Sequence, residues 1–138
     1  LITEHMYSKN RILLTAEKVR GFTLEGRKFV YLRRASLPAG YYEVKYDGKT
    51  KVYVRWQKSM QERYTVSQLV RVFEEKQSYF ILKDNQYFPV KSKKSALAVF
   101  GDRKSEIKKH LSKSGVHYND DRATGIAAMA HHFDSIAN

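Results

Sequence analysis

The residues whose side chains are best suited to binding a ligand lie in the stretch YYEVKYDGKTKVYVRW, residues 41 to 56. Read as two strands of a hairpin, this stretch places cations and phenols on one side of a sheet, namely Tyr41, Lys45, Lys51, Tyr53 and Arg55. Cations for phosphates and aromatic rings for bases make up the surfaces of sequence-tolerant single-stranded nucleic-acid binders. The same face would suit a sugar ring with anionic groups. Lysine and tyrosine are also ordinary residues on the solvated side of a sheet, so both interpretations stay open.

A second group of cations follows in a segment that we expect to be helical. It comprises Lys91, Lys93, Lys94, Arg103, Lys104, Lys108, Lys109 and Lys113. Lys104 and Lys108 are one turn apart, as are Lys109 and Lys113, so the charge spreads around the helix instead of forming a single stripe. Such a helix could lie on phosphates. A solvated helix face has the same composition, and we prefer that interpretation.

Metal binding is not favoured by the spacing of the histidines, which are His5, His110, His117, His131 and His132. Two histidine ligands on one helix are usually about three or four residues apart. His131 and His132 are adjacent, and His110 and His117 are seven residues apart. We therefore predict no metal site.

Residue patterns typical of catalysis are also missing from the sequence. The acidic pairs Glu74 with Glu75 and Asp120 with Asp121 lie where elements end, and caps and turns favour carboxylates there. The glycines are spaced as turn residues, without a phosphate loop, a dinucleotide turn or a serine-centred elbow. Cysteine is absent, which excludes a cysteine nucleophile and thiolate zinc sites. We predict no catalytic residues, no cofactor and no enzyme.

Length and composition set further bounds. At 138 residues with 42% hydrophobic residues, the chain has the size of one domain, and we expect a single domain over residues 1–138. Its apolar runs are far shorter than the roughly 18 residues of a membrane span, so we expect no transmembrane segment. The formal net charge of +12 favours an anionic partner, such as nucleic acid, a lipid surface or an acidic glycan.

The elements that position these residues are mainly strands. Residues 11–90 alternate short apolar runs with turn residues, which predicts an antiparallel meander, strongly curled or barrel-like. The expected strands are Arg11 to Thr15, Val19 to Leu24, Lys28 to Arg33, Tyr41 to Tyr46, Lys49 to Gln57, Leu69 to Glu74, Tyr79 to Lys83 and Gln86 to Val90. We expect turns at residues 25–27, 38–40, 47–48 and 84–85, and an irregular connection over residues 58–67.

The register of the hairpin at Asp47 and Gly48 follows from burial. A three-residue loop ending at Gly48 pairs even-numbered residues with even-numbered ones and separates apolar from basic side chains. A two-residue loop would expose valines and tyrosines at about 1.5 to 3 kcal/mol each. We therefore expect Trp56 to pack inside and Lys51 to project outward.

After Val90 the hydrophobic period becomes that of helices. Ser92 is expected to cap a helix through Phe100, Asp102 to cap a helix from Arg103 to Ser114 that ends at Gly115, and Asn119 or Asp120 to open a third. Strands followed by a three-helix segment over residues 91–138, packed on the sheet, predict an α+β fold.

Several segments carry a resemblance to a known group of proteins. They are GFTLEGRKFVYL (21–32), AGYYEVKYDGKTKVYVR (39–55), YFILKDNQYFPVKSKKSAL (79–97), FGDRKSEIKKHLSKSG (100–115) and the final HHFDSIAN. In these segments the chain resembles a broad set of uncharacterised exported proteins of Bacteroidetes, and it departs from them at residues 57–67. The resemblance implies export to the periplasm or cell surface, with a leader ahead of Leu1. It implies no activity and no site residues.

Three functional hypotheses follow from these observations. The preferred one is a non-catalytic exported module of the cell envelope that binds or supports another macromolecule, such as an anionic glycan, a lipid surface or a protein. The alternative is a nucleic-acid-binding protein that uses the basic, tyrosine-rich face of residues 41–55. A hydrolase would need a pocket with paired carboxylates or histidines.

Overall fold

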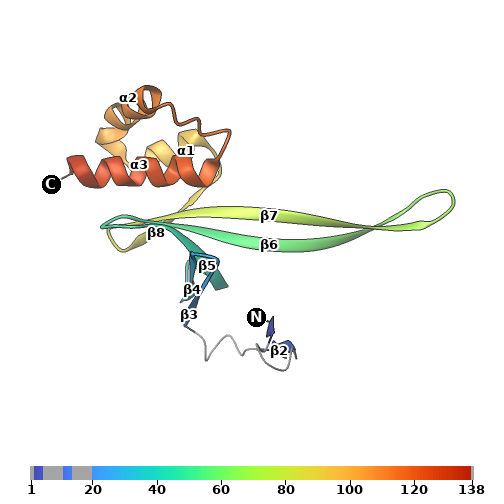
Figure 1. Ribbon diagram of the computed structural model, residues 1–138. Coiled ribbons are helices and arrows are strands. Elements are labelled where there is room, and N and C mark those ends of the chain that lie inside the picture. The colour runs from blue at the N-terminus through green and yellow to red at the C-terminus, as the bar shows by residue number, and fades with distance from the viewer. Residues whose placement is uncertain (1, 5–10, 14–19, 138) are drawn as a thin grey trace.

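The computed structural model describes residues 2–4, 11–13 and 20–137, which form a curled antiparallel sheet with helices at the C-terminal end (Figure 1). The strands of this sheet are β3 (Gly21–Leu24), β4 (Arg27–Arg34), β5 (Leu37–Asp47), β6 (Lys51–Tyr64), β7 (Leu69–Lys83) and β8 (Gln86–Val90). The helices are α1 (Lys93–Val99), η1 (Gly101–Arg103), α2 (Lys104–Ser114) and α3 (Arg122–Ile136). A separate two-stranded sheet pairs β1 (Ile2–Glu4) with β2 (Arg11–Leu13). The predicted α+β class is confirmed.

The strands β3 to β8 are hydrogen-bonded in chain order, each antiparallel to the next. This is the predicted meander, and it is strongly curled, with β3 to β5 running across the direction of β6 and β7 (Figure 1). The turns predicted at residues 25–27 and 84–85 are present, and Glu25, Asp84 and Asn85 adopt positive φ there. The strand expected at Arg11 to Thr15 pairs with β1 instead of joining the meander, and residues 14 and 15 lie outside the described residues.

The turn predicted at residues 38–40 is wrong, because these residues belong to β5. The chain turns instead at residues 35–36, where Arg34 pairs with Leu37. Leu37 is buried in a cluster with Tyr42, whose hydroxyl donates to the Pro38 carbonyl at 2.6 Å. Because Leu37 is buried, β5 already begins at Leu37, whereas the turn residues at positions 38–40 suggested a later start.

The irregular connection predicted for residues 58–67 is also wrong over most of its length. β6 continues to Tyr64, β7 is one unbroken strand, and their pairs run from Lys51 with Leu82 to Tyr64 with Leu69. β5 and β8 pair only with the base of this hairpin, so residues 57–76 project as a two-stranded ribbon (Figure 1). The prediction failed because residues 58–64 show no burial pattern, whereas cross-strand hydrogen bonds form without burial. We call residues 57–76 the ribbon.

Each face of the sheet base has its own core. On one face Val52, Ile81 and Val90 pack against the helices. The helical side of this core consists of Ala96, Leu97, Phe100, Ile107, Leu111, Ile126, Met129 and Ala130. On the opposite face, inside the curl, Leu32, Leu37, Tyr42, Tyr53 and Phe80 pack together. Both faces of the hairpin are therefore partly buried, and neither is a purely solvated face.

The helix ends follow their capping residues. Ser92 caps α1 in a capping box with Ser95, and Gly115 ends α2 at a φ of 75°, both as predicted. Asp102 lies in η1 and does not cap α2. The cap of α3 is Asp121, not Asn119 or Asp120, and its carboxylate accepts from the Thr124 backbone N–H at 3.1 Å.

Candidate functional site

A bulge at Lys45 decides where the predicted hairpin residues project. The register of β5 on β6 shifts by one residue between Val44 and Tyr46. One extra residue on one strand reverses which of its side chains share a face with those of the neighbouring strand. The five predicted residues are therefore divided, with Tyr41 and Lys45 on the face of Glu43 and Lys51, Tyr53 and Arg55 on the opposite face. The structure does not bring the five together on one surface.

The surroundings of these residues differ as well. Tyr53 is only 6% exposed, and burial raises its pKa to about 12. Lys51 donates a hydrogen bond to Asp47. The Tyr41 ring packs edge-on against Phe22 and Tyr31, and burial raises its pKa. Arg55 is half-buried. A ligand approaching one face would meet at most three of the five.

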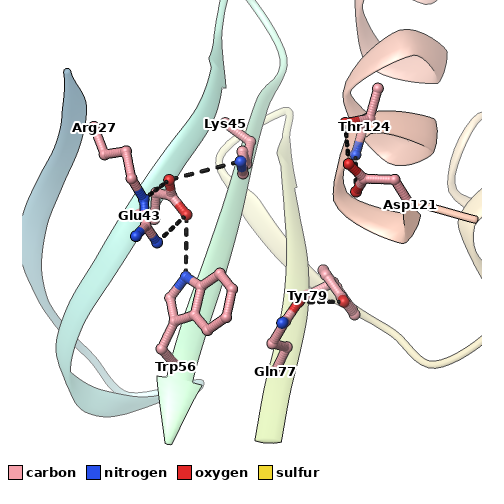
Figure 2. Close-up of polar contacts among 8 residues, drawn as sticks. All are labelled: Arg27, Glu43, Lys45, Trp56, Gln77, Tyr79, Asp121 and Thr124. Atoms are coloured by element: carbon pink, nitrogen blue, oxygen red, sulfur yellow. Dashed lines mark hydrogen bonds and ion pairs between the residues drawn. The ribbon is translucent and has the colours of Figure 1, made fainter. Parts of the chain in front are cut away.

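Glu43 organises the face that Lys45 shares (Figure 2). Its carboxylate is 2% exposed and accepts from Arg27 Nε at 2.8 Å, Arg27 Nη2 at 3.0 Å and Trp56 Nε1 at 3.0 Å. The ammonium of Lys45 lies 3.7 Å from it. The hydrogen bond from Arg27 is the main cause that holds the pKa of Glu43 below its ordinary value, and the Trp56 and Lys45 contacts act in the same direction. Trp56, which we expected to pack inside, is half-buried and lies on an ionic cluster.

Next to this cluster is a cleft of about 450 Å³ between the sheet and the start of α3. We call it the base cleft, because it lies at the base of the ribbon. Its lining consists of Lys45, Trp56, Gln77, Tyr79 and residues 119–123. In Figure 2, Tyr79 donates to Gln77 at 2.7 Å, and the hydroxyl of Thr124 donates to Asp121 at 2.8 Å. Carboxylates and cations share this lining, so the cleft is not selective for anions.

A surface of a single sign lies on α1 and α2. Residues 91–113 contain seven lysines, one arginine and two carboxylates. Their net charge is therefore half of the net charge of +12 of the whole chain, although they make up only a sixth of its length. Of the two carboxylates, Glu106 is already paired with Arg103 at 3.0 Å. We call the six outward lysines the lysine face: Lys93, Lys94, Lys104, Lys108, Lys109 and Lys113. All six are exposed, and none forms an ion pair with a residue in the part of the chain that the structure describes.

Four of these lysines border one groove of about 490 Å³ between α1 and α2. Its lining consists of Lys93, Lys94, Leu97, Lys104, Ser105 and Lys108. A second hollow continues along α2 over Ser105, Lys108, Lys109, Ser112 and Lys113. Neither lining contains a carboxylate. Ammonium groups without counter-charges, set beside serine hydroxyls, form a surface on which anionic groups can replace water.

The packing of the two helices explains why the groove escaped prediction. α2 turns Ile107 and Leu111 into the core, which leaves the flank of Lys104 and Lys108 beside α1. On α2 alone the charge is spread around the helix, as the sequence suggested. The groove could not be predicted from the sequence because it depends on tertiary packing. Lys93 and Lys94 of α1 complete it only when α1 packs beside α2.

Two of the histidines meet between α2 and α3, a contact that sequence spacing did not indicate. The rings of His110 and His132 stack with centroids 3.9 Å apart and planes 6° apart. Burial, and then the neighbouring His110, lower the pKa of His132. Among the residues that the structure describes, which exclude His5, no group of three or more His, Asp or Glu side chains could hold a metal ion.

Comparison of the chain with protein-family models, with curated proteins and with solved structures found no match. In the described residues, no helix is long and apolar enough to cross a membrane. The functional assignment therefore depends on the geometry of the surfaces.

Proposed function

We propose that this protein is a non-catalytic module that binds an anionic macromolecule through the lysine face of α1 and α2. The observation that carries the proposal is the groove of about 490 Å³, which is bordered by four lysines and no carboxylate. Like charges held together repel one another, and an anion with several charges would relieve that repulsion at several points at once. A polymer or a surface supplies such repeated charges.

The lining of the groove favours binding over catalysis. It offers ammonium groups, one serine hydroxyl and the apolar side chain of Leu97. These groups can hold and orient an anion, and they lie on helices whose inner faces are buried in the core. We assign no reaction to the groove.

The class of macromolecule that we propose first is an anionic glycan or lipid surface of the cell envelope. The resemblance to exported proteins supports this choice, because it implies a location where such polymers are the main polyanions. The lysine face and its adjoining hollow form an open surface along α2, which suits an extended partner.

Nucleic acid is the second candidate, and the lysines and serines that line the hollow along α2 favour it. Both side chains donate to phosphate oxygens and fix the position of a protein on a backbone without reading its sequence. The surface for this candidate is the lysine face, since the five residues first predicted lie on two faces of the sheet.

The test compares two triple variants that each remove three positive charges. Lys94→Gln with Lys104→Gln and Lys108→Gln removes three of the four lysines that border the groove, whereas Arg20→Gln with Arg33→Gln and Lys49→Gln removes exposed cations elsewhere. Fluorescence anisotropy would follow binding to a sulfated oligosaccharide and a DNA duplex, and co-sedimentation would follow binding to phosphatidylglycerol vesicles.

At roughly 1 kcal/mol per lysine near an anionic surface, the groove variant should bind about two orders of magnitude more weakly. The control variant should keep most of the affinity, since it has the same net charge. Equal losses in both variants would contradict the groove and indicate only a general charge effect. The probe with the highest affinity identifies the class of partner.

A further inference from the structure

The ribbon exposes apolar side chains that the rest of the molecule keeps inside. Of the six large hydrophobic residues that are exposed in the described part of the chain, five lie on it: Met60, Tyr64, Val66, Leu69 and Phe73. Phe73 is 72% exposed and Tyr64 is 81% exposed. A two-stranded hairpin without a packed face is marginally stable in water, and contiguous exposed apolar groups mark interaction sites.

Four of these side chains, all except Val66 in the turn at the tip, lie in rows on one face of the ribbon. Alternation along the paired strands places four cross-strand pairs of the ribbon on this face, together with one further pair at its base, and we call these five pairs the ribbon face. From the base to the tip the pairs are Trp56 with Gln77, Lys58 with Glu75, Met60 with Phe73, Glu62 with Arg71, and Tyr64 with Leu69. The central row is apolar, the rows on either side of it are charged, and the outer rows each carry an aromatic ring.

The two charged rows, one on each side of the central row, have opposite orders of charge: the cation is on β6 in one row and on β7 in the other. On β6 the cation Lys58 lies before Met60 and the anion Glu62 lies after it, whereas on β7 the anion Glu75 and the cation Arg71 hold the corresponding places. A second ribbon rotated by 180° about an axis through the central row would therefore place every charge opposite one of the other sign.

We propose that the ribbon face binds a second copy of this chain, with the two ribbons antiparallel and face to face. In this arrangement Met60 and Phe73 meet their own counterparts, as a two-fold axis requires. Lys58 faces Glu62 of the partner subunit, and Arg71 faces Glu75 of the partner subunit. Trp56 and Tyr64 come together from opposite ends.

The ends of the ribbon fit the same arrangement. The tip of one ribbon reaches the base of the other, where the base cleft of about 450 Å³ lies between the sheet and α3. The tip carries Val66, which is fully exposed, in a turn closed by the bond from the Thr65 N–H to the Gln68 carbonyl at 2.8 Å. We infer that this turn enters the base cleft of the partner.

Charge favours a second copy over a polyanion as the occupant of this face. The ribbon carries four cations and three carboxylates, so it is nearly neutral although the whole chain has a net charge of +12. Two such chains would repel each other through their lysine faces. Antiparallel ribbons place the helices at opposite ends, because the helices lie at the base of the ribbon (Figure 1), and this keeps the basic surfaces far apart.

The test measures the oligomeric state by sedimentation velocity over a wide range of protein concentration. The wild-type protein should dimerise, and Lys58→Glu should raise the dimer dissociation constant by at least about tenfold, because the two-fold axis repeats each new repulsion. Glu62→Lys should do the same. Combined in one chain, K58E and E62K should restore the dimer, since each new charge again faces its opposite.

A second double variant separates this contact from the pairing within one ribbon. Lys58→Glu with Glu75→Lys keeps opposite charges across the strands of one chain but places like charges opposite each other in the dimer. It should therefore be monomeric, while circular dichroism shows an unchanged fold. A wild-type protein that is monomeric at every concentration would overturn the proposal. So would a K58E/E75K variant that dimerises while K58E/E62K does not.

Discussion

Glu43 is a buried carboxylate that links three neighbouring strands where the sheet curls. It lies on β5 and accepts hydrogen bonds from Arg27 on β4 and Trp56 on β6 (Figure 2). An ionised carboxylate can be 2% exposed only because these donors replace the water that it loses. The cluster also takes up the charge of Lys45, which explains why this lysine does not stand as an isolated cation.

Replacing Glu43 by Gln should therefore destabilise the protein. The amide keeps the size of the side chain but lacks the charge, so the Arg27 and Trp56 donors lose part of their bonding, at a cost of about 1 to 3 kcal/mol. Because Arg27 is 42% exposed and can regain water, we expect the lower half of that range. Urea unfolding followed by circular dichroism measures the loss.

Trp56 gives this prediction a second readout, since it is the only tryptophan. Its emission should change in Glu43→Gln when the indole loses its carboxylate acceptor. The matched control is Glu106→Gln, which removes an exposed carboxylate paired with Arg103 and should change stability by less than about 0.5 kcal/mol. Equal effects of the two substitutions would contradict the structural role of Glu43.

The carboxylate of Glu43 should also make the free energy of unfolding depend on pH in the acidic range. Because its pKa is lower in the folded protein than the ordinary value of 4.5, the stabilisation is present above that pH and is lost as the pH falls below it. The difference in unfolding free energy between wild type and Glu43→Gln should therefore shrink below pH 4.5. A difference that stays constant down to pH 3 would show that Glu43 is not stabilised as a carboxylate.

At the residue scale the sequence could predict little of this site. The alternation of β6 was correct, and Trp56 and Lys51 lie neither in bulk solvent nor fully inside. The bulge at Lys45 changed the face of β5, because one extra residue leaves no mark in a hydrophobic pattern. Glu43 gave no signal either, since its burial depends on partners from two other strands.

At the scale of elements, α3 is fastened to the β5–β6 turn by Asp134. Its carboxylate accepts from the Tyr46 hydroxyl at 2.8 Å and from the Thr50 backbone N–H at 2.9 Å. Burial, and then the bond to Asp134, raise the pKa of Tyr46 to about 12. The contact leaves no room at Gly48, where a Cβ atom would lie 2.2 Å from the Tyr46 hydroxyl oxygen and 2.7 Å from Asp134 Oδ2.

Gly48→Ala should therefore push α3 away from the turn and destabilise the protein by about 1 to 3 kcal/mol. In a Tyr46→Ala background the nearest obstacle is absent, so the added cost of Gly48→Ala should fall. A double-mutant cycle by urea unfolding measures this coupling. Strictly additive effects would contradict the steric account.

The helices were more predictable than the strands for a physical reason. The ends of α1 and α2 are set by local capping at Ser92 and Gly115, which a sequence displays directly. The ribbon is held by cross-strand pairing between residues up to 19 positions apart, the pair of Gln57 with Lys76, and its side chains are mostly exposed. A pattern of burial cannot reveal strands that do not bury their side chains.

At the scale of the whole molecule, the meander was predictable because short turns force neighbouring strands together. The separation of a basic helical end from a nearly neutral ribbon was not, because it depends on how far β6 and β7 extend past their neighbours. Our two proposals use this separation, with a polyanion at the helical end and a second copy of the chain on the ribbon.

The two proposals together predict a dependence on polymer length. A dimer with lysine faces at opposite ends can hold one long polyanion at two points, which raises the apparent affinity without new contacts. Wild type should therefore bind a long polymer more tightly per site than a short one, and the variant with Lys58→Glu and Glu75→Lys, which we expect to be monomeric, should not. Titrations with size-fractionated polymer check this, and an equal length effect in both proteins would exclude two-point binding.

The measurement that tests the central claim most directly is the salt dependence of polyanion binding. With a DNA duplex as the probe, the slope of log affinity against log salt counts the phosphates that the protein neutralises, at about 0.9 per contact. Neutralising Lys94, Lys104 and Lys108 should reduce that slope by about 2 to 3, while the Arg20, Arg33 and Lys49 control keeps it. An unchanged slope in the groove variant would show that the lysine face does not bind the polyanion.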